Sequence, residues 1–125
     1  MKLWLILGAV NGFLSVALGA FAAHGLANRV GENELAAFET GARYHMYHAL
    51  ALLAVAWLVQ QTASSMAAAA GWAFLAGMIL FSGSLYYLGI TGSRALVMVT
   101  PVGGVAFLAG WALIAVAAWG ISPAR

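Results

Sequence analysis

The sequence predicts an all-α integral membrane protein: a four-helix bundle with a short amphipathic helix at the membrane interface between the first two spans. The chain is 65% hydrophobic and only 6% charged, which leaves too little polar surface to cover a globule in water. Four apolar stretches approach the roughly 20 residues that a transmembrane helix needs. The longest polar segment, residues 24–43, lies between the first two stretches and separates them.

The four spans are expected at residues 3–23, 44–59, 66–88 and 102–120. Together they use most of the chain, so residues 1–125 form a single membrane domain. Residues 60–65 make a short polar turn, which places the second and third spans side by side in opposite directions. Aromatic residues concentrate at bilayer interfaces, and alternating spans place two sets at opposite faces: Tyr44, Tyr47, Tyr86 and Tyr87, against Trp4, Trp57, Trp72 and Trp119.

Small residues form a stripe along the first span. They follow one another at spacings of four, three and four, which puts them on one helix face: Gly8, Gly12, Ser15 and Gly19. Such a face lets another helix approach closely in lipid, so we expect packing there, with a lipid groove as the alternative. Gly103 and Gly110 give the fourth span a similar face.

Asn11 lies near the middle of the first span, one position away from the small-residue stripe. An unpaired amide is costly in hydrocarbon. We therefore expect an interspan hydrogen bond from Asn11, or a small polar cavity around it.

The interfacial helix is expected over residues 33–43. Asn33 can cap its start, and apolar residues then recur at spacings of three and four: Leu35, Phe38, Ala42 and Met46. We expect this helix to lie on the membrane surface and to bend near Gly41 into the second span.

Two of the three histidines, His45 and His48, stand one turn apart at the start of the second span, and three interpretations stay open. With His24 they could ligate a metal ion or haem, because imidazole is a common ligand. Alternatively they satisfy loop carbonyls or a helix end, while Glu39 pairs with Arg43 at headgroup depth. In the third interpretation a basic pocket of His24, Arg43, Tyr47 and His48 holds a lipid headgroup or an anion.

Composition argues against several other functions. The five basic residues are scattered along the chain, without the cluster that binds nucleic acid. No cysteine is available for catalysis or metal binding, and the three carboxylates all lie in residues 32–39. We therefore expect a protein that is not an enzyme and that uses no cofactor or metal.

Four segments resemble a known membrane family: GAFAAHGL at 19–26, FETGARYHMYHALALL at 38–53, FSGSLYYL at 81–88 and TPVGGVAFLAGW at 100–111. The chain is similar to family 423 of the domains of unknown function, which includes YgdD- and YwdK-like bacterial proteins and a eukaryotic relative, transmembrane protein 256. The resemblance implies a small four-span protein of the inner membrane, without an established activity, substrate or catalytic residue. The family usually has Gln at the position of His45, so the resemblance implies that His45→Gln is nearly silent.

These observations favour a non-enzymatic accessory or lipid-associated protein with membrane lipid as its partner, and with a homo-oligomer or a larger membrane complex as further possibilities. A small transporter or channel is the alternative, and a haem or metal protein is a third hypothesis. We expect Arg43 to be the most function-sensitive charge, because its guanidinium can join the segment before the second span to the bundle through several hydrogen bonds.

Overall fold

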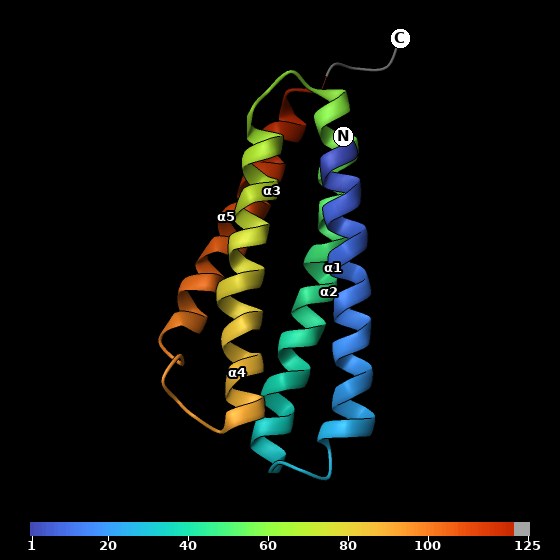
Figure 1. Cartoon of the computed structure of the whole chain (residues 1–125). Helices are drawn as coiled ribbons and strands as arrows, with labels where there is room; N and C mark the ends of the chain where they lie inside the picture. The colour runs from blue at the N-terminus through green and yellow to red at the C-terminus, as the bar shows by residue number, and fades with distance from the viewer. Residues whose placement is uncertain (122–125) are drawn as a thin grey trace.

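The computed structural model describes residues 1–121 and shows four long helical segments that run alternately up and down (Figure 1). The first is α1 (Lys2–Phe21) and the second is α2 (Glu32–Gln61). The third consists of α3 (Met66–Gly77) and α4 (Gly83–Thr91), and the fourth is α5 (Val99–Trp119). The fold is therefore all-α.

Two short π-helical turns lengthen these segments. The turn η1 (Ala22–Leu26) extends α1, and η2 (Met78–Ser82) joins α3 to α4 without a break. As a result, three helical segments are long and apolar enough to cross a membrane: Lys2–Leu26, Met66–Thr91 and Val99–Trp119.

The remaining helix, α2, is not in that group, and it contains the charged and polar side chains of residues 32–48 as well as Gln60 and Gln61. It nevertheless connects the lower end of η1 to the upper end of α3 (Figure 1). Its 30 residues extend about 45 Å at 1.5 Å per residue. A chain whose first and third segments both span the bilayer in the same direction has to cross back through α2.

The structure does not confirm a separate interfacial helix over residues 33–43, because these residues are the first turns of the continuous helix α2. The apolar stripe of these residues, which was expected to face the membrane surface, is turned toward the other helices. Phe38 is fully buried, and Ser82 Oγ of η2 donates a hydrogen bond of 2.8 Å to Gly41 O. Gly41 also lies against Leu85 and Tyr86, so its missing side chain admits a neighbouring helix rather than a bend.

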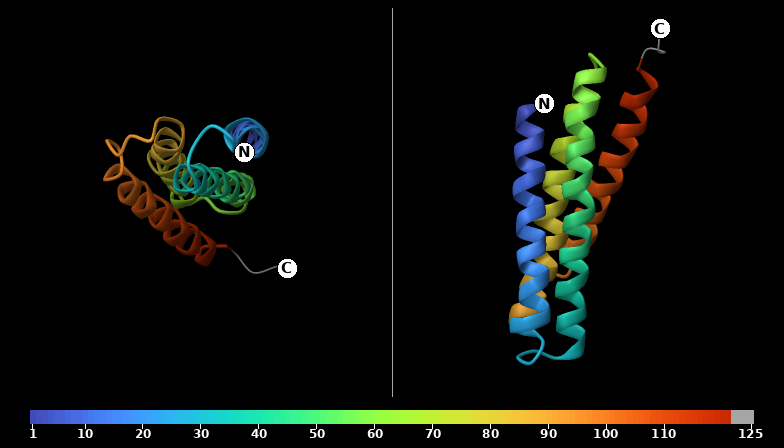
Figure 2. Two further views of the ribbon diagram at one scale, coloured as in Figure 1. Left: turned by 90° about the horizontal axis from the view of Figure 1, so that it is seen from below. Right: turned by 90° about the vertical axis from the view of Figure 1, so that its right-hand side faces the viewer.

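Seen from below, α2 and the α3–α4 segment lie between α1 and α5 (Figure 2). The helix α2 packs against α1 on one side and against α3 and α4 on the other, whereas α5 packs mainly against α3 and η2. The main core lies among these helices and includes Leu52, Val55 and Phe74. The outer faces of α1 and α5 are left to face lipid.

Aromatic rings and glycines interlock α5 with the third segment. Two rings each cover a glycine on the opposite helix, Phe74 on Gly110 and Phe107 on Gly77. In the same antiparallel register, the backbone of Phe81 lies against Gly103. One turn further along, Ser84 and Thr100 share a hydrogen bond between their hydroxyls. In the same way, Trp4 of α1 covers Gly71 of α3. Bare glycine backbones thus provide the close packing that helix association in lipid depends on.

Candidate functional site

The small-residue stripe of α1 divides into packed and open positions. A Cβ at Gly8 would lie 2.7 Å from Leu53 Cδ2, so this position faces α2 closely, and Ser15 is buried. Gly12 and Gly19 have open space where a Cβ would be. The stripe therefore packs α1 against α2 at Gly8 and leaves a gap at Gly12.

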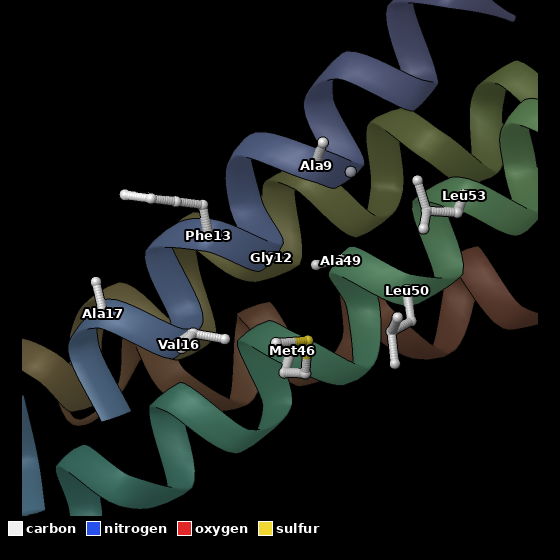
Figure 3. A pocket seen from close by; sticks show the side chains of 10 residues that line it. Ala9, Gly12, Phe13, Val16, Ala17, Met46, Ala49, Leu50 and Leu53 are labelled. Carbon is white, nitrogen blue, oxygen red and sulfur yellow. The ribbon is translucent and has the colours of Figure 1, made fainter. Parts of the chain in front are cut away.

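That gap belongs to a groove of about 560 Å³ between α1 and α2, which we call the α1–α2 groove. Figure 3 shows how side chains of the two helices border it. The lining is apolar throughout: Gly8, Ala9, Gly12, Phe13, Val16, Ala17, Met46, Ala49, Leu50 and Leu53. Phe13 is 74% exposed and Leu50 is 57% exposed. The groove consequently opens on the outer face of the bundle, where a bilayer would supply hydrocarbon.

Beside this groove, three polar side chains from three helices form one hydrogen-bonded chain. His45 of α2 is buried, and its Nε2 lies 2.8 Å from Asn11 Oδ1 of α1. Its Nδ1 lies 2.8 Å from the Tyr86 hydroxyl of α4. Asn11 Nδ2 in turn donates to Leu7 O over 2.8 Å. We call Asn11, His45 and Tyr86 the polar chain.

The direction of the hydrogen bonds in the polar chain follows from its one fixed end. Leu7 O can only accept, so the amide nitrogen of Asn11 faces it and leaves Oδ1 to accept from His45. His45 therefore donates from Nε2, and in the neutral imidazole Nδ1 accepts from the Tyr86 hydroxyl. Both imidazole nitrogens are used, and the polar chain links α1, α2 and α4.

On the side of α2 that faces α5, His48 also uses both of its ring nitrogens in hydrogen bonds. Trp111 Nε1 of α5 donates to His48 Nε2 over 3.0 Å, and His48 Nδ1 donates to Tyr44 O over 2.7 Å. The imidazole also stacks on the ring of Phe107, with centroids 3.6 Å apart. Because an indole N–H can only donate, His48 is neutral with its proton on Nδ1. Both nitrogens are occupied, and neither is free for a metal.

The four residues expected to form a lipid or anion pocket are not brought together. His24 is exposed on η1 at the end of α1, and Arg43 is exposed on α2. His48 faces α5. Of the other three residues, only Tyr47 lines the same pocket as His48. Within residues 1–121, no three His, Asp or Glu side chains lie close enough to hold a metal ion.

Arg43 has a different position from the one expected. Its Nη2 donates to Thr40 Oγ1 over 3.4 Å, a long contact within its own helix. Glu39 and Arg43 lie on the exposed face of α2, because Phe38, Ala42 and His45 occupy the packed face. Arg43 thus does not join the start of α2 to the other helices.

Replacing Arg43 with alanine should accordingly leave the start of α2 as protected as before. Substitutions of exposed residues with few partners usually change stability by less than about 0.5 kcal/mol. Hydrogen exchange over residues 31–44 in detergent micelles measures this directly, with Thr40→Ala as the control that removes the same hydrogen bond. Faster exchange in Arg43→Ala alone would show that the guanidinium has partners beyond Thr40.

The sequence does not reveal the hydrogen-bond partners of the polar side chains between the helices. The tyrosine pattern predicts Tyr86 at the membrane interface, but its hydroxyl is hydrogen bonded to His45 between the helices. The resemblance implies that His45→Gln is nearly silent, and it gives no sign of the hydrogen bonds that His45 makes with Asn11 and Tyr86. Nothing in the sequence singles out Trp111 as the hydrogen-bond donor to His48. An available signal was that Asn11, His45 and Tyr86 all needed a polar partner within an apolar chain.

Comparison with known proteins gives a consistent result. A family described as "Protein of unknown function (DUF423)" matches residues 18–104. The chain is 49% identical over 119 residues to the UPF0382 membrane protein YwdK of Bacillus subtilis, covering 94% of this chain and 97% of the relative. It is 44% identical over 117 residues to the UPF0382 inner membrane protein YgdD of Escherichia coli, covering 94% and 89%. No solved structure matches the chain.

Proposed function

This chain belongs to the DUF423 family of multi-pass inner-membrane proteins, and we propose that it is a non-enzymatic, lipid-associated protein whose α1–α2 groove holds one acyl chain of a membrane lipid. The observation that carries this proposal is the wholly apolar lining of a groove that opens on the outer face of the bundle. A lateral opening of this kind admits a ligand from the bilayer rather than from water.

The dimensions of the groove suit an acyl chain. Its α1 lining extends from Gly8 to Ala17, which is about 14 Å at 1.5 Å per residue. This is roughly half of the 30 Å hydrocarbon thickness of a bilayer, so a chain from one leaflet can lie along the groove. An empty groove would also forfeit dispersion contacts along both helices, and Gly12 leaves space for the occupant.

The same geometry supports a non-enzymatic role. The imidazoles of His45 and His48 use both of their nitrogens in hydrogen bonds. The carboxylates of Glu32, Glu34 and Glu39 lie at the start of α2, away from these histidines along the helix. These side chains therefore do not form a catalytic arrangement of nucleophile, base and acid.

A small transporter or channel is less well supported. A solute path needs polar groups that are free to face it, whereas Asn11, His45 and Tyr86 are hydrogen bonded to one another. The α1–α2 groove has none of these three residues in its lining.

Two glycines of α1 provide a matched test of the acyl-chain proposal. Gly12 and Gly19 both have open space at their Cβ positions, but only Gly12 lines the groove. Native mass spectrometry after purification in a mild detergent should show retained phospholipid on the wild type and on Gly19→Leu. Gly12→Leu should lose most of that phospholipid, because a leucine side chain fills the groove.

Circular dichroism and size-exclusion chromatography establish that both variants remain folded. Equal phospholipid retention by the two variants, or a wild type without phospholipid, would contradict the proposal. A wild-type oligomer that Gly12→Leu converts to a monomer would show that a second copy of the chain, rather than a lipid, fills the groove.

A further inference from the structure

A second recess lies between α2 and α5, on a different side of α2 from the α1–α2 groove, with a volume of about 390 Å³. Most of its lining residues carry rings: Tyr44, Tyr47, His48, Phe81, Phe107 and Trp111. We propose that this aromatic recess binds the flat, uncharged ring of a lipid-soluble quinone-type molecule. The inference is independent of the acyl-chain proposal, because the two sites share no lining residue.

The position of the recess determines how a ligand reaches it. Its α5 lining extends from Gly104 to Trp111, within the helix Val99–Trp119, so it lies inside the membrane span. Leu108 is 70% exposed and Trp111 is 46% exposed, which opens the recess on the outer face. A ligand therefore arrives dissolved in the hydrocarbon of the bilayer, and charged or strongly polar molecules are excluded.

The rings that line the recess are held in place by contacts with one another. His48 stacks on Phe107 at an interplanar angle of 6° and accepts the indole hydrogen bond of Trp111. Tyr44 lies 4.9 Å from Phe81 between ring centroids. Aromatic side chains held in this way favour a flat ring in stacked or edge contact. A flexible acyl chain gains no such contact and loses rotational freedom on binding.

The polar side chains that line the recess indicate which hydrogen-bonding groups a ligand needs. Both nitrogens of His48 are already hydrogen bonded, and the Trp111 indole donates to one of them. The remaining polar side chains among the lining residues are Tyr44 and Tyr47, whose hydroxyls can donate to an acceptor. No lining residue is charged. A flat ring with carbonyl oxygens and no charge, as in a quinone, meets each of these conditions.

The test is a native mass spectrometry titration of the full chain with decylubiquinone. We expect saturable binding of one quinone. Gly104→Leu should weaken this binding at least tenfold because its side chain occupies the recess, and the open surroundings of Gly104, whose Cβ would lie 3.9 Å from Phe81, make the variant compatible with folding. Tyr47→Phe should weaken binding about fivefold, the usual contribution of one hydrogen bond.

Gly12→Leu is the matched control, since it fills the other groove and should leave quinone affinity unchanged. Binding that does not saturate, equal affinity in wild type and a folded Gly104→Leu, or displacement of the quinone by decane at the same concentration would each overturn the inference. The last result would identify the recess as a second acyl-chain groove. Phospholipid retention, measured in the same spectra, reports separately on the α1–α2 groove.

Discussion

Replacing Gly103 with alanine is expected to push α5 away from η2 and to destabilise the bundle. A Cβ at this position would overlap the backbone nitrogen of Phe81 in η2, as well as its Cα and Cβ. A helix backbone cannot move aside as the end of a flexible side chain can, so the whole of α5 has to shift. Overpacking of a core typically costs 1–3 kcal/mol, and we expect a loss of about 3 kcal/mol in the free energy of unfolding, measured by denaturation of the purified protein in mixed micelles.

The next residue provides the control. A Cβ at Gly104 would meet only Phe81 Cδ2, at an ordinary contact distance of 3.9 Å. Gly104→Ala should therefore change the free energy of unfolding by less than about 0.5 kcal/mol, as expected for a substitution outside tight packing. Equal losses in the two alanine variants would mean that α5 does not pack against η2 through the bare backbone of Gly103.

The second large effect is expected from His45→Leu. This change removes both hydrogen bonds of the imidazole and leaves Asn11 Oδ1 and the Tyr86 hydroxyl without their partner among apolar side chains. Interhelical hydrogen bonds in membranes contribute about 0.6 kcal/mol on average and up to about 1.7 kcal/mol, and an unsatisfied buried group adds a further cost. We expect a loss of about 2 kcal/mol in the free energy of unfolding, together with faster hydrogen exchange in α1.

His45→Gln tests whether the hydrogen bonds, rather than the imidazole ring, are responsible. A glutamine amide has a carbonyl that can accept from Tyr86 and an NH₂ group that can donate to Asn11, the two roles that His45 plays. We expect this variant to lose less than half as much stability as His45→Leu. If the glutamine and leucine variants unfolded alike, hydrogen bonding by the polar chain would not explain the effect of the leucine.

The sequence alone was sufficient to predict the class of the protein and its approximate helices. Apolar stretches at residues 3–23 and 102–120 lie where the structure has α1 and α5. The physical reason is local: in lipid a backbone must satisfy its own hydrogen bonds, and a helix does so within a single segment. Composition and length therefore decide which residues become helices, without any knowledge of their neighbours.

Only the tertiary structure decided what each face of those helices contacts. Spacing put Gly8 and Gly12 on one stripe, but the crossing of α1 over α2 packs the first and leaves a groove at the second. Spacing also put Phe38 on an apolar face, which the structure turns into the bundle as part of one long α2. The partners of His45 are 34 and 41 residues away in sequence. Periodicity specifies a face of a helix, whereas the rotation and crossing of neighbouring helices determine what that face meets.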